Sequence, residues 1–389
     1  MHIAYTEEQE ALRAQVRAYF DALMTPEVTE ECATGETGGP ASLEAVRKMG
    51  ADGWLGIGWP TGYGGQGRTP LEQYIFTNES WRANAPTPFL TINAVGRTIQ
   101  EFGSEEQKDY FLPKILAGDL HFAIGYTEPS AGTDLASLTT RAVLDGDTWV
   151  IDGAKIFTSL ASYADYIWLA ARTDPDAPKH KGITIFAVPT DTPGFSFTKI
   201  PTMVNASTYQ TFYDDVRVGP EAVVGEVNRG WDLIVNQLNY ERISLAPTGS
   251  VERAFEGTLE WARRPVDATG RRRIDDGWVQ ENLARVRAGL DALELMNWKA
   301  ASAATMDPAL SSAIKVYGTE FFLDAYRLLA EVVGPRAAQD RGSPLAVLEG
   351  GLARAMQGSL ILTFGGGVNE IQRDLIAMFG LGMPRVPRM

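Results

Sequence analysis

Two changes of periodicity along the chain constrain its fold more than any other feature. Residues 1 to about 122 carry apolar side chains at helical spacing, as in Glu7–Leu23, and Thr69-Pro70 and Ser104-Glu105 have the character of helix starts. From about 123 to 225 the pattern becomes short β-branched and aromatic runs separated by turn residues. Beyond that point it is helical again. The sequence therefore predicts an α+β chain of three domains: an N-terminal α-helical domain (1–122), a middle β domain (123–225) and a C-terminal helical bundle (226–389).

The internal order of the last two domains follows from the same spacing. Strand-like runs with no helix between them favour a small antiparallel barrel or sandwich in the middle domain. The C-terminal domain has four long stretches with apolar residues three and four positions apart, which predict an antiparallel four-helix bundle. These stretches are Gly230–Trp261, Trp278–Ala304, Ser311–Val333 and Pro344–Leu362.

Composition excludes several classes of function. The chain has 49 acidic and 35 basic residues in 389, a net charge of −14, which argues against a nucleic-acid partner because phosphate binding needs clustered cations. One cysteine, Cys32, and three scattered histidines exclude cysteine- or histidine-built metal sites. The N-terminus has no apolar signal core, and no apolar run approaches the ~20 residues of a membrane span. We therefore expect a cytoplasmic protein without a metal or a membrane association.

The segment Gly62–Gly67 matches the G-x-G-x-x-G pattern of dinucleotide-binding proteins. That pattern needs a strand before it and a helix opening on its last glycine, and neither is expected here. We interpret it as a structural loop.

Three other segments have chemical potential, each with a structural alternative. Ala123–Asp134 puts small and hydroxyl residues on a loop, suited either to a flat polar ligand or to a turn into the first strand. Three glycines at 365–367 separate two apolar helices, as an interhelical turn or for close approach of backbone to an anion. Glu241 continues the apolar stripe of Trp231, Ile234, Leu238 and Leu245. A carboxylate there is either a base in a pocket or an exposed partner of Arg242.

Several motifs together resemble those of one family across essentially the whole chain. YTEPSAGTD at 126–134 is similar to the TEPxAGSD signature of the acyl-CoA dehydrogenases, and GAKIFTSLASYADY at 153–166 to their G-x-K-x-W-I-T-N-x-x-x-A-D motif. GGGVNEIQRDLIA at 365–377 resembles the C-terminal signature ending in IQR, and FYDDVRV and NRGWDLI lie between these in the family's order.

The resemblance implies the fold predicted above, non-covalently bound FAD, and α,β-dehydrogenation of an acyl-CoA thioester. In this family a carboxylate removes the pro-R α-proton while the β-hydrogen passes as hydride to flavin N5, and an electron-transfer flavoprotein accepts the electrons. Thr158 matches the threonine near N5, and Thr133 the hydroxyl residue near both cofactor and thioester. The cofactor-binding residues it implies are Ile124, Tyr126, Thr127, Gly132, Thr133, Phe157, Thr158, Ser159 and Gly366; the substrate-binding ones are Thr133, Tyr240 and Arg242.

The position of the catalytic base follows from a difference between this chain and the medium-chain-type members of the family. Medium-chain-type members carry the glutamate shortly before IQR, where this chain has Gly366, and Glu370 is in a different register. Isovaleryl- and long-chain-type members carry it in an ER dipeptide in the first bundle helix, which Glu241-Arg242 matches. The resemblance and the stripe therefore both indicate Glu241.

A second departure concerns the subunits. Family homotetramers lend RxxFG and QxxGGxG motifs to a neighbour's FAD, but here Arg271–Gly277 lacks Phe-Gly and Glu331–Arg336 lacks the glutamine and double glycine. In lacking these motifs, the sequence resembles the catalytic chain of actinobacterial steroid side-chain dehydrogenases. That resemblance implies an α2β2 heterotetramer with a sister dehydrogenase subunit.

Three alternatives stay open. A homotetramer could use the cluster Arg271–Arg273 in place of the lost motifs. A flavin-dependent monooxygenase or acyl-CoA oxidase would share the flavin loops, and a non-catalytic partner subunit would share the fold.

Overall fold

The computed structural model describes residues 3–34, 38–204, 207–244, 246–265, 268–303 and 307–385, without the side chains of residues 34 and 239–244. These residues form two compact units. The sheet unit comprises Leu23–Arg68 and Pro86–Glu241, and the helical unit comprises Met1–Ala22, Thr69–Ala85 and Arg242–Met389. The order of helices, sheet and helices agrees with the predicted fold.

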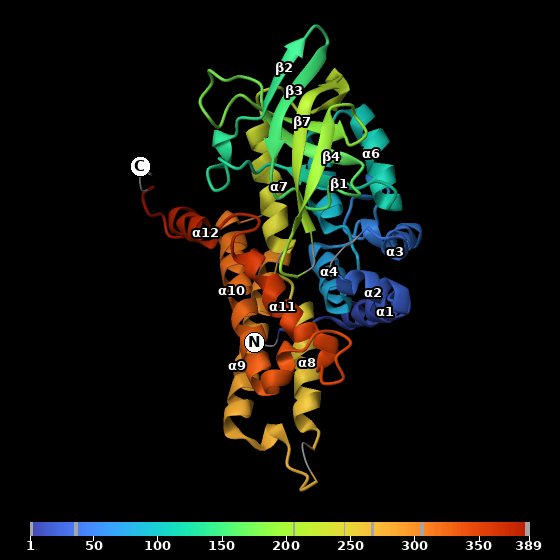
Figure 1. Ribbon diagram of the computed structural model, residues 1–389, viewed down its shortest axis with the longest axis vertical. Helices are drawn as coiled ribbons and strands as arrows, with labels where there is room; N and C mark the ends of the chain where they lie inside the picture. The colour runs from blue at the N-terminus through green and yellow to red at the C-terminus, as the bar shows by residue number, and fades with distance from the viewer. Residues whose placement is uncertain are drawn as a thin grey trace. The chain divides into compact units, whose positions relative to one another are not determined.

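The sheet unit is built on eight strands in the order β6-β7-β3-β2-β4-β5-β8, with β1 paired to β4 (Figure 1). Most neighbours are antiparallel, but β1 and β2 each run parallel to β4, a departure from the all-antiparallel prediction. The strands are β1 Phe122–Gly125, β2 Arg141–Asp145, β3 Thr148–Lys155, β4 Tyr166–Arg172, β5 Ile183–Pro189, β6 Phe195–Pro201, β7 Ser207–Val218 and β8 Val223–Val224.

The strands begin and end where the sequence changes from β-branched residues to turn residues. β2 and β3 form a hairpin that pairs Asp145 with Thr148 across Gly146, whose φ of 64° is one that glycine adopts without strain. β4 and β5 are buried along nearly their whole length, as their continuous apolar sequences require.

Among the described residues, the α-helices of the sheet unit are α2 Pro26–Thr34, α3 Pro40–Ala51, α5 Arg97–Phe102, α6 Glu105–Ala117 and, as far as Glu241, α7 Gly230–Ser244. Helix α6 starts with a capping box, in which Ser104 and Gln107 satisfy each other's backbone N–H groups. The Gln107 amide also donates to the carbonyl oxygens of Glu221 and Val223, at 2.9 and 2.7 Å, and so ties α6 to β8.

The glycine-rich segment Gly62–Gly67 is a loop, as predicted. A Cβ at Gly65 would lie 2.2 Å from the carbonyl oxygen of Trp59, so the glycine permits close packing of the loop on itself. The segment begins within a short 3₁₀ turn, Thr61–Tyr63, and no strand leads into it.

The helical unit combines α1 Glu7–Leu23 and α4 Pro70–Ala83 with α8 Gly249–Arg263, α9 Gly277–Ala301, α10 Pro308–Val333, α11 Gly351–Ser359 and α12 Asn369–Leu375. The predicted single helix Gly230–Trp261 is wrong, because α7 ends at Ser244 and α8 begins at Gly249. Pro247 lies between them, and proline disfavours the helical conformation in the residue before it.

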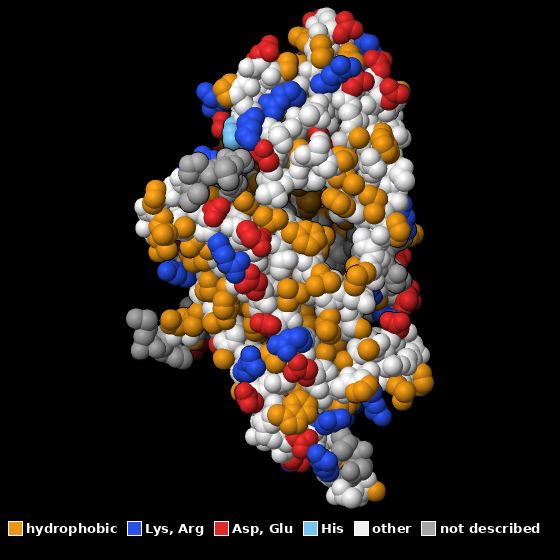
Figure 2. Space-filling model, turned by 60° about the vertical axis from the view of Figure 1, so that its left-hand side comes forward, with side chains coloured by type: hydrophobic (Ala, Val, Ile, Leu, Met, Phe, Trp, Pro, Cys, Tyr) orange, Lys and Arg blue, Asp and Glu red, His pale blue; other side chains and the backbone are white. Residues whose placement is uncertain are grey.

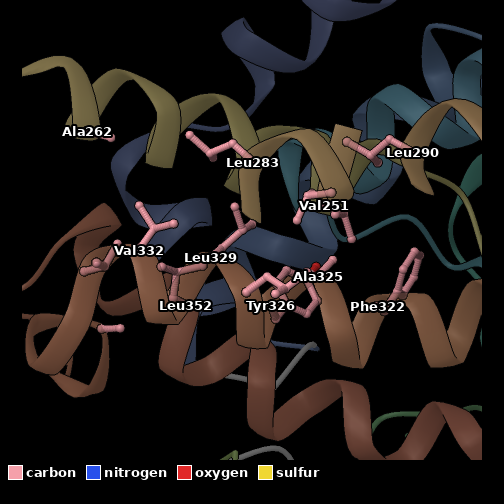
Figure 3. Close-up of a cluster of buried hydrophobic side chains, with 14 of the residues drawn as sticks. Val251, Ala262, Leu283, Leu290, Phe322, Ala325, Tyr326, Leu329, Val332 and Leu352 are labelled. Atoms are coloured by element: carbon pink, nitrogen blue, oxygen red, sulfur yellow. The ribbon is translucent and has the colours of Figure 1, made fainter. Parts of the chain in front are cut away.

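The core of the helical unit lies between α8, α9, α10 and α11. Figure 3 shows α10 side chains pointing towards those of α8 and α9, with Phe322, Tyr326 and Leu329 in successive turns. These residues recur at three- and four-residue spacing, so they lie on one face of α10.

A buried carboxylate joins α1 to α4. Glu79 accepts hydrogen bonds from Arg13 at 2.9 Å and from Arg17 at 2.8 Å. Asn78, beside it, accepts from the Gly249 N–H at 2.8 Å and so connects α4 to the start of α8.

Acidic, basic and hydrophobic side chains are interspersed on the face shown in Figure 2. Within the described ranges, no helix combines the length and apolar character needed to cross a bilayer. In the same part of the chain, no three His, Cys, Asp or Glu side chains come together as metal ligands.

Candidate active site

Two segments that follow different strands lie side by side in the sheet unit. The first is Tyr126–Glu128, just after β1, and the second runs from Lys155, the last residue of β3, to Ser159. The Ile156 N–H donates to the Thr127 carbonyl oxygen at 2.8 Å. The Lys155 ammonium donates to the Tyr126 carbonyl oxygen at 3.1 Å and to Glu128 Oε1 at 2.8 Å. The two most distinctive sequence motifs therefore form one structural feature.

The Lys155–Glu128 ion pair is fully enclosed, with exposed fractions of 0% and 4%. Glu128 also accepts hydrogen bonds at 2.7 Å from the backbone N–H and hydroxyl of Thr139 and from the Thr140 N–H. Burial favours the protonated carboxyl, but the lysine charge and these donors outweigh it and lower the pKa of Glu128 to about 2. Burial also disfavours the charged form of Lys155 and lowers the pKa of its ammonium to about 8, although the attraction of Glu128 opposes this shift.

The second segment contains one aromatic residue with a strained backbone. Phe157 has a φ of 61° and its side chain is 60% exposed. A bulky residue with positive φ is an outlier that persists only when its neighbours hold it, and such strain concentrates at functional sites. Here Lys155 anchors one side, and the Thr158 N–H, donating to the Tyr209 carbonyl oxygen at 2.9 Å, anchors the other.

The hydroxyl that a ligand can reach is that of Ser159 rather than Thr158. The Thr158 side chain is fully buried, with its Oγ1 3.3 Å from Thr211 Oγ1. Ser159 is partly exposed, with its Oγ 3.2 Å from Thr208 Oγ1. In the W-I-T-N motif Phe157 aligns with the tryptophan and Ser159 with the threonine, so the match of Thr158 to that threonine is wrong by one residue.

The remaining sheet-unit candidates line the first segment. Ile124 and Thr127 are half-buried, and Gly132 and Thr133 are exposed. A tight turn, in which the backbone groups of Glu128 and Ala131 exchange hydrogen bonds at 3.0 and 3.1 Å, carries the last two to the surface. Ile124 belongs to β1, and a Cβ at Gly132 would lie 3.9 Å from Thr127 Cγ2, so these two candidates lie along or beside the first segment.

Tyr126 is different, because its side chain points into the protein. Its hydroxyl accepts a hydrogen bond from Trp168 Nε1 at 3.0 Å and donates to Oε1 of Gln237 on α7. This chain of bonds connects the first segment to the helix that carries Glu241.

The side chains of Tyr240, Glu241 and Arg242, and all of Leu245, lie outside the described residues. The described part of α7 buries Leu233, Ile234 and Gln237, whereas Trp231 and Leu238 of the predicted stripe are half-buried. Position 241 is four residues beyond Gln237, so the helical period puts it on the same face as this buried set.

Gly366 belongs to the helical unit. Gly366 and Gly367 have φ values of 67° and 100°, so the turn before α12 needs glycine for its own conformation. The buried Lys315 ammonium holds this turn by donating to the Gly367 carbonyl oxygen at 2.6 Å and to Asn369 Oδ1 at 2.7 Å.

Sequence reasoning missed two features of the site. The Lys155–Glu128 pair was visible as a base and an acid inside two otherwise small or apolar motifs. Gln237 was visible as an amide four residues before Glu241, on the same helical face.

Comparison with known proteins covers the same segments. Models of the acyl-CoA dehydrogenase N-terminal, middle and C-terminal domains match residues 6–119, 123–216 and 228–381. Acyl-CoA dehydrogenase FadE26 of Mycobacterium tuberculosis is 52% identical, over 100% of both chains. The long-chain specific mitochondrial enzyme of Sus scrofa is 30% identical, over 96% of this chain and 86% of that protein.

Two solved structures are similar over nearly the full length. One is the ChsE4-ChsE5 complex from Mycobacterium tuberculosis, with a TM-score of 0.93, 52% identity, and 99% of this chain and 100% of that chain covered. The other is the Tcur3481-Tcur3483 steroid acyl-CoA dehydrogenase, with a TM-score of 0.94, 49% identity and the same coverage. The motifs, the fold and these similarities give one conclusion: the chain belongs to the acyl-CoA dehydrogenase family.

Proposed function

We propose that the protein carries out FAD-dependent α,β-dehydrogenation of a bulky acyl-CoA thioester, with Glu241 as the base that takes the α-proton. The observation that carries this proposal is the pair of segments joined by Lys155 and Glu128. The two segments present backbone groups, a hydroxyl and an aromatic ring at the surface, and the buried Lys155–Glu128 pair holds them in place.

These residues fit an isoalloxazine ring. Phe157 is strained, exposed and anchored at both sides, as a residue that packs against a flat ligand would be. Thr127 and Ser159 offer partly exposed hydroxyls, and Gly132 leaves room for close approach to the backbone. When bound, FAD supplies the acceptor for the β-hydrogen. Ile124, Tyr126, Thr133, Thr158 and Gly366 complete the proposed set; Thr158 would contribute only its backbone carbonyl, because its side chain is buried and its N–H donates to Tyr209.

Glu241 would act on a weakly acidic carbon. Position 241 shares its face of α7 with the buried Ile234 and Gln237, and a carboxylate in a site from which water is excluded is a stronger base. We assign Tyr240, Arg242 and Thr133 to substrate binding, by their place beside the base and in the exposed part of the first loop.

The test of the base is Glu241→Gln. We expect unchanged FAD content and a rate of flavin reduction by acyl-CoA lowered about 10²–10⁴-fold, the usual contribution of a general base. Asp232→Asn is the matched control, because Asp232 is an exposed carboxylate of the same helix, paired with Arg229 at 2.7 Å. Rapid flavin reduction in Glu241→Gln would exclude this residue as the base, and oxygen uptake coupled to turnover would indicate an oxidase instead.

The substrate class comes from the relatives. A steroid acyl-CoA dehydrogenase is 49% identical to this chain, which favours the CoA thioester of a steroid side chain over a straight-chain acyl-CoA. Comparing flavin reduction by octanoyl-CoA with reduction by a steroid side-chain CoA tests this: preference for octanoyl-CoA would contradict it. An electron-transfer flavoprotein is the proposed acceptor.

Two observations support a heterotetramer with a sister subunit, and a third supports a subunit interface in general. Both similar solved structures are named as pairs of proteins. Arg271 and Arg272 form ion pairs with Asp276 and Asp275 of their own loop, at 2.8 and 2.6 Å. Their charges are therefore less available to bind the pyrophosphate of FAD in a neighbouring subunit. Large apolar side chains are exposed near the C-terminus, as at an interface: Leu360, Ile361, Phe364, Phe379, Leu381 and Met383.

The visible flavin spectrum separates the two assemblies. We expect the chain purified alone to be nearly colourless, and the complex co-expressed with a second dehydrogenase subunit to contain bound flavin. A yellow, active homotetramer would contradict the heteromeric assembly and leave the chemistry of Glu241 untouched.

A further inference from the structure

Helix α10 buries a polar stripe to which the proposed function gives no role. Ser312, Lys315 and Thr319 each have 0% of their surface exposed. Their spacing of three and four residues places them on one face of the helix. The buried face of a helix is usually apolar, and a buried ammonium is costly unless hydrogen bonds replace the water that it loses. The partners of Lys315 therefore indicate what this stripe does.

Lys315 holds the backbone of the glycine turn, Gly365–Gly367. Its ammonium donates to the Gly367 carbonyl oxygen at 2.6 Å and to Asn369 Oδ1 at 2.7 Å. The Thr319 hydroxyl donates to the Lys315 carbonyl oxygen at 2.7 Å, and it accepts from Asn369 Nδ2 at 3.1 Å. These contacts turn the amide oxygen of Asn369 towards the ammonium. One buried charge therefore ties the end of the turn to α10.

The turn depends on this contact for its shape. Gly366 and Gly367 have φ values of 67° and 100°, which glycine adopts without strain, but glycine also loses the most conformational freedom when it is ordered. Successive glycines therefore do not fix a backbone conformation by themselves. A Cβ at Gly367 would lie 2.8 Å from Gln372 Nε2, so a larger residue would displace the buried amide. Lys315 supplies the constraint that the glycines lack.

The bond from Lys315 also sets the direction of the next backbone N–H. The Gly367 carbonyl oxygen and the Val368 N–H belong to one peptide group, and in a trans peptide these two groups point in opposite directions. No cis peptide bond occurs in the part of the chain that the structure describes. Because the carbonyl oxygen faces the ammonium, the N–H faces away from it. A cation at the carbonyl oxygen also polarises the peptide, which makes the N–H a stronger donor.

A second group at the turn indicates that an acceptor binds there. Gln372 is 0% exposed, and its Oε1 accepts from the Ser312 hydroxyl at 3.0 Å. Its Nε2, beside Gly367, has no hydrogen-bond partner among the described residues. A buried donor without a partner is costly, and native proteins rarely keep one without a reason. The donors at this turn suit an oxygen acceptor, and FAD is rich in such atoms.

We propose, building on the proposed function, that Lys315 is a positioning residue for the flavin cofactor. It holds the Gly367–Val368 peptide so that the Val368 N–H donates to an oxygen atom of FAD. Gly366, which has no side chain, lets the cofactor approach the backbone of the turn. Lys315 touches neither the cofactor nor the substrate and acts through the turn alone.

The donor is tested by the FAD dissociation constant of the assembly, measured from the fluorescence of flavin released on dilution. Val368→Pro removes the N–H and keeps the local backbone, because Val368 has a φ of −63°, close to the value that proline imposes. Val368→Ala shortens the side chain but keeps the N–H. We expect the dissociation constant of Val368→Pro to exceed that of Val368→Ala roughly 10-fold, the effect of losing one hydrogen bond.

The positioning role is tested by Lys315→Met, which keeps the aliphatic stem and removes the ammonium. Binding must then order the turn, so the dissociation constant should also rise roughly 10-fold. In Lys315→Met/Val368→Pro the two effects should not multiply, because both interrupt the same contact. Phe322→Leu is the matched control: it loosens the core on the same helix, and its dissociation constant should equal that of the wild type.

Three results would overturn the role of Lys315. They are equal dissociation constants in the two Val368 variants, effects that multiply in the double variant, and a rise in Phe322→Leu as large as that in Lys315→Met. If Lys315→Met did not assemble, Thr319→Val would decide, because it frees the amide that faces the ammonium. It should raise the dissociation constant by less than the loss of the lysine does, and no change would overturn the role.

The same measurements separate this role from the proposed function. A wild-type assembly that binds no FAD would overturn the proposed function itself. An active Glu241→Gln would overturn the proposed base and leave the dissociation constants, and so the role of Lys315, unchanged.

Discussion

The strongest energetic prediction concerns the buried Lys155–Glu128 pair. Lys155→Met keeps the volume of the aliphatic stem and removes the ammonium that lies 2.8 Å from Glu128 Oε1 and 3.1 Å from the Tyr126 carbonyl oxygen. Breaking a buried pair on one side costs about 3–5 kcal/mol, because the remaining charge stays desolvated. Glu128 keeps its three donors from Thr139 and Thr140, so we expect the lower end of that range, about 3 kcal/mol.

The assay is urea unfolding followed by tryptophan fluorescence, since Trp149 and Trp168 are buried in the sheet. Lys179→Met is the matched control: Lys179 lies 2.7 Å from Asp134, but both side chains are more than half exposed, and such a pair contributes at most about 1 kcal/mol. The double variant Glu128→Gln/Lys155→Met removes both charges and should recover at least about 1 kcal/mol of the loss.

Two results would refute this reasoning. Equal losses in Lys155→Met and Lys179→Met would mean that burial does not set the cost. A double variant no more stable than Lys155→Met would mean that the loss does not come from the unpaired carboxylate. We also expect Lys155→Met to bind FAD more weakly, because the lysine joins the two segments.

The remaining predictions concern acid stability and the helical core. Because the pKa of Glu128 is lowered to about 2 from an ordinary 4.5, its contribution to stability is present above about pH 4.5 and is lost as the pH falls towards 2. Urea midpoints measured from pH 6 to pH 3 should fall less steeply in Glu128→Gln than in the wild type; parallel curves would contradict the assignment. Phe322→Ala, at a site 1% exposed, should lower the stability of the helical unit by about 3–5 kcal/mol by calorimetry, and a loss below about 1 kcal/mol would show that the core closes over the cavity.

The strands were the most predictable part of the fold. Their signals are local: β-branched runs such as Thr148–Ile151 end at turn residues such as Gly146, and strand and turn both follow from neighbouring residues. The parallel pairing of β1 with β4 has no such local signal, because it brings Ile124 beside Trp168 across more than a full hairpin of sequence.

Helix boundaries show the limits of periodicity. Apolar spacing continues from Ile234 to Ala262 across Pro247, so period alone joins α7 and α8, and only the backbone rule for proline divides them. In the candidate site, motifs indicate which residues matter, but burial decides how they act. Thr158 and Ser159 are adjacent hydroxyl residues, and only the fold distinguishes the enclosed one from the accessible one.

The discontinuous helical unit has a consequence for synthesis on the ribosome. Asn78 and Arg82 of α4 bond to Gly249 and Glu256 of α8, which follow 171 and 174 residues later in the chain. At elongation rates of about 5–20 residues per second this interval lasts roughly 10–30 s. During that time α1 and α4 are already synthesised and can pair through Glu79. Their apolar faces stay exposed until the helices that cover them are made. The sheet unit can close in the interval, so the order of translation favours completing the two segments joined by Lys155 and Glu128 before the bundle.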